Sequence, residues 1–277
     1  MKKTMFARCF AGTFQPAGFL NGIFVLLFGL LLGNCAKEDV AAPGAEKLDP
    51  SNSANPFDYV GQQHNDALNY IFSDHAGEVA ALQNDALALQ NLYLKLCVQF
   101  ALEQDYADAK AFPLDGYLKL MTQQQQGLIV EHNFRDYAAY LSALDMPPHL
   151  RPWVEKFYAM LSEYPVENAG SLPGLFKTIR AFEAEAMVAL GAEESAIILI
   201  AASTARYSAA YWNDKKGFDG AQLFGWGESF FADAFGAGMG AAAGAAVGAA
   251  AGGAPSVPGA VIGGLIGGGV ASAAFAG

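Results

Sequence analysis

Apolar residues recur at steps of three or four along most of the chain between residues 55 and 213, which is the spacing of one helix face. No stretch alternates apolar and polar residues for long enough to predict a strand. We therefore expect an all-α fold, a helical bundle of about seven helices followed by a Gly/Ala-rich helical hairpin. The first helix has Phe57, Val60, His64, Leu68 and Ile71 on one face, and the others are expected near 78–104, 114–126, 133–144, 150–163, 172–190 and 193–213.

Helix-breaking residues separate these segments. Asn55 is placed to cap the first helix, and Pro56 would occupy its first turn, where a missing N–H costs nothing. The segment EESAIILIAASTARYSAAYW, residues 193–212, is apolar on nearly all sides at its centre, so we expect it to be the most buried helix. The other boundaries are marked by Pro113, Gly127, Pro147, Pro148, Pro165, Gly170 and Gly191.

The last 44 residues, 234–277, contain no charged side chain. Two prolines in APSVP, residues 254–258, forbid a continuous helix there and suit a turn. The arms on either side, about 233–254 and 259–276, would be roughly 33 Å and 27 Å long as helices. Both lengths are near the thickness of the bilayer hydrocarbon, about 30 Å, so the pattern predicts a helical hairpin that enters a membrane.

Glycine recurs every four residues along both arms of this hairpin. Each glycine weakens an isolated helix in water by roughly 1 kcal/mol relative to alanine, whereas in lipid small residues let helix backbones touch and drive association. Such tandem GxxxG runs resemble the glycine-zipper segments of bacterial envelope proteins and of bacteriocin-like peptides that act on membranes. The packing positions are Gly236, Gly240, Gly244, Gly248 and Gly252 in the first arm and Gly259, Gly263 and Gly267 in the second.

Two other interpretations of the tail are a soluble hairpin folded against the helical domain and a disordered low-complexity segment. Alanine and glycine add little to membrane insertion. The first arm has Phe235, Met239 and Val247 as its larger apolar residues. We therefore expect it to enter lipid together with the second arm or as an oligomer.

The N-terminus has the pattern of an export signal, with three basic residues before an apolar stretch at 19–32. The sequence LLGNC that follows resembles the lipobox of bacterial lipoprotein precursors. This resemblance implies that Cys35 carries diacylglycerol and becomes the N-terminus after cleavage, although Asn34 departs from the usual small residue at that position. The alternative is an uncleaved membrane anchor. Either way we expect the body in the cell envelope, at the outer membrane or the periplasmic face.

The remaining segments complete the expected domain organisation. NPFDYVGQQHN and ASTARYSAAYW resemble paired signatures of a group of helical lipoproteins from bacterial envelopes, for which no activity can be carried over. The resemblance thus supports fold and location only. The expected division is a signal at 1–35, a flexible tether at 36–54, a helical domain at 55–213, an aromatic and glycine-rich linker at 214–232 and the hairpin at 233–277.

Charge limits the partners that the sequence predicts, and the cysteine count limits its disulfides. Removing the three basic residues of the signal leaves 13 basic against 27 acidic side chains, a net charge of −14. An acidic surface without a lysine or arginine cluster excludes nucleic acid as a partner. Cys97 is the one cysteine left for the mature fold, so we expect no internal disulfide and a buried thiol.

The candidate polar cluster consists of Asp58, His64 and Arg206. His64 lies on the apolar stripe of the first helix, where a hydrogen-bonded core histidine is the ordinary role and a catalytic base is the alternative. Arg206 lies in an apolar helix and needs a carboxylate when buried. We expect it to pair with Asp58 or with an acid of another helix, the alternative being an anion-binding arginine.

The chain lacks the common signatures of enzymes. It has no HExxH, no GxSxG and no nucleotide-binding glycine motif after a strand, so we expect no metal, no cofactor and no catalysis, with a helical hydrolase as the residual alternative. The patterns predict a lipid-anchored envelope protein with a structural or interaction role, whose partners are membrane lipid and other copies through the hairpin. The alternative is a pore-forming or bacteriocin-like effector whose helical domain masks the hairpin until release.

Overall fold

The computed structural model describes residues 48–82, 85–104, 113, 146–164, 169–215, 226–252 and 257–276. Within these ranges the chain forms helices and no strand, which confirms the all-α class. The signal with Cys35, the first part of the tether and the helices expected at 114–126 and 133–144 lie outside the described residues.

The N-terminal part of the fold contains α2 (Asp58–Asn69), a π-helical turn η1 (Tyr70–Asp74), α3 (Ala76–Ala81) and α4 (Ala86–Glu103).

Two boundaries differ from those expected here. The first helix begins at Asp58, because Asn55 makes a turn in which its side-chain oxygen accepts from the backbone N–H of Phe57 at 2.8 Å. The helix expected over 78–104 is divided, because Asp85 caps a new helix by accepting a hydrogen bond from the N–H of Ala88 at 3.0 Å. Both corrections come from short polar side chains that bond to nearby backbone.

The next helices are α8 (Arg151–Glu163), a 3₁₀ turn η2 (Ala169–Ser171), α9 (Leu172–Leu190) and α10 (Ala196–Asp214). Proline lies in the first turn of both α8 and α9, where its missing N–H is tolerated. Gly191 ends α9 with φ of +79°, a conformation that other residues rarely adopt. Almost every side chain of α10 is buried, as its apolar run predicts.

The C-terminal hairpin consists of α12 (Trp226–Gly252) and α13 (Val257–Ala276). Helix α12 begins seven residues before the expected position at 233, so the last part of the 214–232 linker is helical. The hairpin is also not separate from the helical domain, because residues 48–277 form one compact unit. Among the helices in the described ranges, none is both long and apolar enough to cross a membrane.

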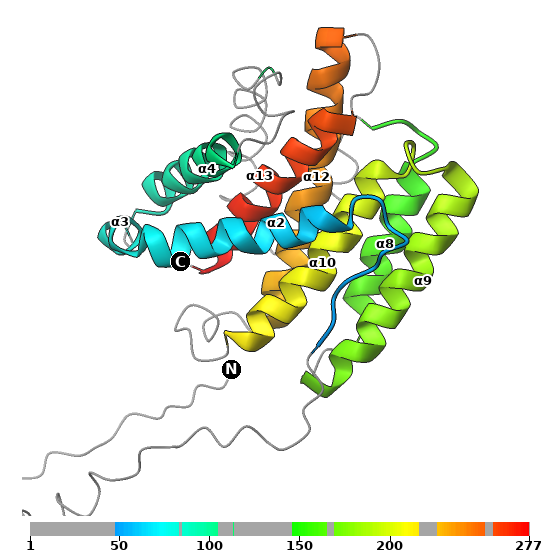
Figure 1. Ribbon diagram of the computed structural model, residues 1–277, viewed down its shortest axis with the longest axis horizontal. Helices are drawn as coiled ribbons and strands as arrows, with labels where there is room; N and C mark the ends of the chain where they lie inside the picture. Colours follow the sequence, from blue (N-terminus) through cyan, green and yellow to red (C-terminus); the bar gives the residue numbers. More distant parts are fainter. Residues whose placement is uncertain are drawn as a thin grey trace, which may run out of the picture. The chain divides into compact units, whose positions relative to one another are not determined.

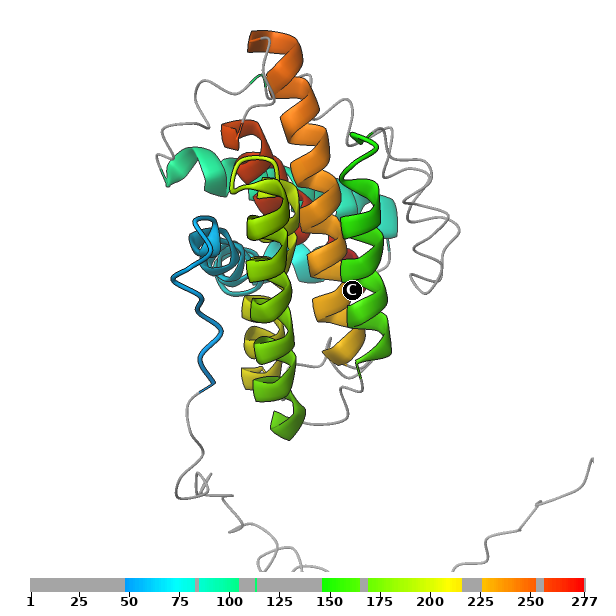
Figure 2. The same ribbon diagram turned by 90° about the vertical axis from the view of Figure 1, so that its right-hand side faces the viewer.

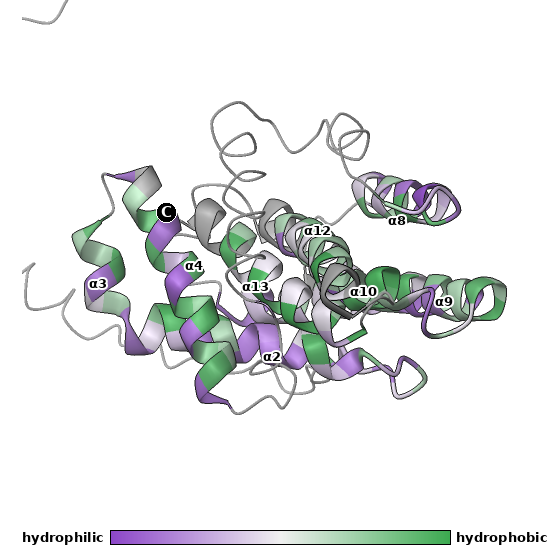
Figure 3. Ribbon diagram, turned by 90° about the horizontal axis from the view of Figure 1, so that it is seen from above, coloured by the Kyte–Doolittle hydropathy of each residue, from purple (hydrophilic) through white to green (hydrophobic). Residues whose placement is uncertain are grey.

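The hairpin lies between the other helices of this unit. Figure 1 shows α12 and α13 beside α10, with α2 crossing them; α12 packs mainly on α10, α13 packs on α4 and α2, and α2 also packs directly on α10. Figure 2 shows α12 alongside α8, and Figure 3 shows that the hairpin is coloured mostly pale to green while α2 carries purple stretches. Helix α13 contacts α2, α4 and α10, so both arms are covered.

Among the described residues, the two largest parts of the core both include side chains of the hairpin. Around α8, α9 and α10 it contains aromatic side chains, among them Phe157, Phe182 and Phe235. Around α4, smaller aliphatic side chains such as Leu96 meet Ile266 of α13. The hairpin therefore contributes to both parts of the core.

Candidate functional site

The two arms of the hairpin touch through glycine. A Cβ atom built on any of five glycines, Gly236, Gly240, Gly244, Gly263 and Gly267, would collide with the backbone of the opposite arm, so no side chain separates the two helices there. Gly248 is buried further along α12, and Gly252 is the last residue of that helix. The facing pairs are Gly236 with Gly267, Gly240 with Gly263 and Gly244 with Gly259.

A second set of glycines lets the surrounding helices approach the hairpin. A Cβ on Gly264 would lie 2.5 Å from the side chain of Ile200 on α10, and one on Gly268 would lie 2.9 Å from His64 Cδ2 on α2. A Cβ on Gly269 would lie 2.6 Å from the Cys97 sulfur on α4. The glycines of α13 thus bring it into close contact with α10, α2 and α4.

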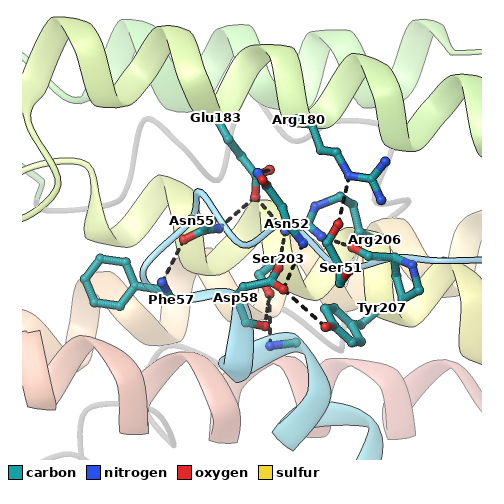
Figure 4. A network of polar contacts seen from close by, with 12 residues as sticks. Ser51, Asn52, Asn55, Phe57, Asp58, Arg180, Glu183, Ser203, Arg206 and Tyr207 are labelled. Atoms are coloured by element: carbon teal, nitrogen blue, oxygen red, sulfur yellow. Dashed lines mark hydrogen bonds and ion pairs between the residues drawn. The ribbon is translucent and has the colours of Figure 1, made fainter.

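Arg206 lies at the centre of a buried polar cluster where α2, α9 and α10 meet (Figure 4). Its guanidinium donates to Asp58 Oδ1 at 2.5 Å and to Glu183 Oε1 at 2.8 Å. The Tyr207 hydroxyl donates to Asp58 Oδ2 at 3.2 Å, and burial together with the Asp58 charge raises the pKa of Tyr207 to about 12. Two carboxylates share one cation, which offsets the cost of burying each charge.

The segment 48–55, which we call the strap, is fastened to this cluster. Asn52 Nδ2 donates to Glu183 Oε2 at 2.6 Å, and Asn55 Nδ2 donates to Glu183 Oε1 at 2.7 Å. Asn55 Nδ2 also donates to the carbonyl of Leu199 at 2.9 Å. Glu183, which has no exposed surface, therefore accepts hydrogen bonds at both of its oxygens.

Two arginines hold the strap backbone as well. Arg180 of α9 donates to two strap carbonyls at 2.5 and 2.9 Å, and Arg206 donates to the carbonyl of Pro50. The flexible tether expected over 36–54 is therefore fixed in its last residues, because their carbonyls are the acceptors for these side chains.

A second buried polar cluster surrounds Asp233 of α12. Its Oδ2 accepts hydrogen bonds from Ser208 Oγ and, at 3.0 Å, from Trp212 Nε1, both on α10. His64 Nε2 of α2 lies 3.7 Å from the same oxygen, and neither His64 nor Asp233 has exposed surface. His64 Nδ1 lies 3.2 Å from Asn65 Oδ1. The cluster thus joins α12 to α2 and α10.

The expected cluster of Asp58, His64 and Arg206 is divided between these two places. Asp58 and Arg206 form the expected ion pair, and Arg206 is occupied by protein carboxylates rather than open to an external anion. His64 lies instead beside Asp233, so the three residues do not form one site.

Sequence reasoning missed the two buried carboxylates. Glu183 follows Ile179 by four residues and so lies on the buried stripe of α9, which is a signal of burial that could have found it. Asp233 is the last charged residue before the uncharged tail, and α12 continues through it. Its inward direction depends on how α12 packs against α10, which the sequence pattern does not contain.

The described residues offer little for substrate chemistry. No three His, Cys, Asp or Glu side chains in these ranges are grouped closely enough to hold a metal ion. A cavity between α8, α10 and α12 has a volume of about 10 Å³, close to that of one water molecule. It is lined by Met146, Val154, Phe157, Tyr158, Ile197, Ile198, Ala201, Gly238 and Met239 and exposes no polar surface.

Comparisons with protein-family models, with curated proteins and with solved structures found no match. The features of this chain that bear on its function are the enclosed hairpin and the two buried polar clusters.

Proposed function

We propose that this chain is a lipid-anchored envelope protein that stores an uncharged helical hairpin inside its own bundle and delivers it to a membrane. The observation that carries this proposal is the enclosure of α12 and α13 by α2, α4, α8 and α10. The last 44 residues have no charge, yet most of those whose burial is described, within 234–248 and 257–271, are packed against protein rather than presented at the surface. Such a hairpin would otherwise expose a large apolar surface, which promotes association.

The hairpin is suited to transfer as a unit. Its helices satisfy their own backbone hydrogen bonds, which is the requirement for any segment that enters lipid. The arms touch through glycine backbones, so this contact needs no side chain from the surrounding helices. Leaving the bundle changes what covers the outer faces of the hairpin and can leave the contact between its arms intact.

The lipid on Cys35 would hold the protein at the membrane that receives the hairpin. Two roles follow from insertion. The inserted hairpin would serve as a second anchor or as a contact between copies, or it would open the bilayer as a pore-forming effector does. The proposal assigns no catalytic role to the chain.

A disulfide between α13 and α4 that can be formed and reduced provides the test. A Cβ on Gly269 lies 2.6 Å from the Cys97 sulfur, so Gly269→Cys places a second thiol where oxidation would tie α13 to α4. The variant is made in the mature lipidated chain, in which Cys9 has been removed with the signal and the Cys35 sulfur is held in a thioether, so that this one pair of thiols is left. Gly269→Ala, treated with the same oxidant, is the matched control because it adds the Cβ without the crosslink.

The measurements are hydrogen–deuterium exchange of residues 86–103, which α13 covers, and leakage of dye from phosphatidylethanolamine and phosphatidylglycerol vesicles at pH 7 and pH 5. We expect vesicles to raise exchange in the reduced protein and the control and to leave the oxidised protein unchanged. Leakage would support the effector role, and raised exchange without leakage would support the anchoring role. Equal exchange in oxidised and reduced protein at both pH values would overturn the proposal.

A further inference from the structure

Asp233 has an unusual position in the chain and in the fold. It is the last charged residue before the 44 uncharged positions of the tail, and it has no exposed surface. It lies on α12, so the stored hairpin enters the bundle with a carboxyl group inside the protein. The site is separate from the Arg206 cluster and has no part in holding the strap.

The groups that face Asp233 favour its charged form. The Trp212 indole can only donate, and it donates to Oδ2 together with the Ser208 hydroxyl. From α2, His64 Nε2 faces the same oxygen at 3.7 Å. On α10, the pKa of Tyr211 is raised by burial and then by the charge of Asp233. Helix α13 has no titratable side chain, and α8 brings the Tyr158 hydroxyl to the carbonyl of the next residue, Ala234, at 3.0 Å.

A membrane reverses this preference. In the bundle, two donors from α10 compensate the buried charge, whereas in lipid a charged aspartate is costly and these donors are left behind. The carboxylate that accompanies the hairpin into the bilayer therefore takes up one proton from water and becomes a neutral carboxylic acid. Because the inserted state binds one more proton than the stored state, a lower pH shifts the equilibrium toward insertion.

We propose that Asp233 is a proton-operated latch, which keeps the hairpin in the bundle while it is ionised and permits release when it is protonated. This inference rests on the proposed storage and delivery of the hairpin and names its regulation. Anionic lipid headgroups attract protons, so the surface of the receiving membrane would itself favour release.

The test follows release against pH with the assay described above, between pH 8 and pH 4.5, in the full chain. The wild-type protein should show increasing exchange of residues 86–103 in the presence of vesicles as the pH falls. Asp233→Asn has nearly the same shape but cannot take up the proton, so its release should be independent of pH. Glu194→Gln removes an exposed carboxylate and should behave like the wild type.

Ser208→Ala keeps the test informative if Asp233→Asn does not fold. Removing the hydroxyl deletes one hydrogen bond to the ionised form, so the midpoint of release should move up by about one pH unit. An unchanged midpoint in Ser208→Ala, or a pH dependence in Asp233→Asn equal to that of the wild type, would overturn the latch. Release that is absent in every variant at every pH would overturn the proposed function instead, so the two failures are distinguishable.

Discussion

Glu183 and Asp233 are both carboxylates without exposed surface, and both bind side chains of α10. They differ in the groups that face them. Glu183 meets the cationic guanidinium of Arg206 and two amide groups. Asp233 meets an imidazole, a hydroxyl and an indole, of which the hydroxyl and the indole are uncharged donors.

This difference matches what each carboxylate fastens. Glu183 holds the strap and joins α9 to α10, which are parts that stay together in the proposed function. Asp233 joins the hairpin to α2 and α10, which must separate from it. A permanent cation suits a contact that stays closed, and neutral donors around a carboxylate that can itself take up a proton suit a contact that opens.

The largest effect is expected at the contact that stays closed. Arg206→Met should lower the free energy of unfolding by about 3–5 kcal/mol, because it leaves two carboxylates without their cation in the interior. Urea denaturation followed by circular dichroism at pH 7 measures this loss. Adding Glu183→Gln to the same chain removes the fully buried charge and should restore part of the stability. A loss below about 1 kcal/mol would show that Arg206 is not what holds the strap.

A smaller loss is expected from the contact between the arms of the hairpin. Gly263→Ala adds a Cβ that collides with the backbone of Gly240, and neither backbone can move aside without separating the arms. We expect the free energy of unfolding to fall by about 2–3 kcal/mol. Gly77→Ala is the matched control, because a Cβ there meets no atom within 4 Å. Equal effects at the two positions would contradict close contact between the arms.

The sequence could predict the helices but only part of their surroundings. Helical spacing and breakers located α8, α9, α10 and the hairpin, because both signals are local. Glycine at every fourth residue predicts that two helices touch, and the structure shows this contact. It cannot distinguish lipid from protein around the pair, since the contact between backbones is the same in both.

The partners of the buried polar residues were also only partly predictable from the sequence. Asp58 was a predictable partner of Arg206, because a buried arginine requires a carboxylate and few are near an apolar stripe. The second partner, Glu183, depends on how α9 crosses α10, and the position of His64 beside Asp233 depends on how α12 packs between α2 and α10. These are tertiary relations between segments distant in sequence, which local patterns do not encode.

At the contact that opens, His64→Gln should lower the free energy of unfolding at pH 7 by about 1–2 kcal/mol, since it removes a basic side chain beside Asp233 and keeps an amide donor. The matched control is His75→Gln, which removes a partly exposed histidine that contacts Glu78 at the surface. We expect no detectable change there, because water screens exposed pairs. If both variants lose the same stability, the buried pair is no stronger than a surface one, and the contrast between the two contacts loses its electrostatic basis.

Cys97 is the opposite case to Asp233. It is a buried titratable side chain that packs against the hairpin, and its thiol is neutral. Burial raises the pKa of its thiol to about 12, whereas a thiol in the unfolded chain ionises near 8.5. The unfolded state therefore loses a proton first as the pH rises, and the stability contributed by the neutral thiol, which is complete below pH 8.5, falls above it. Between pH 7.5 and pH 9.5 the wild type should lose roughly 1 kcal/mol more than Cys97→Ala, measured by urea denaturation in the presence of reductant. Taking the difference between the two proteins removes the contribution of Tyr93, whose pKa burial also raises. If the stability of the two proteins fell equally with pH, the interior beside α13 would tolerate a thiolate without hydrogen-bond donors. The donors around Asp233 could then not be the reason that its charge is kept inside the protein.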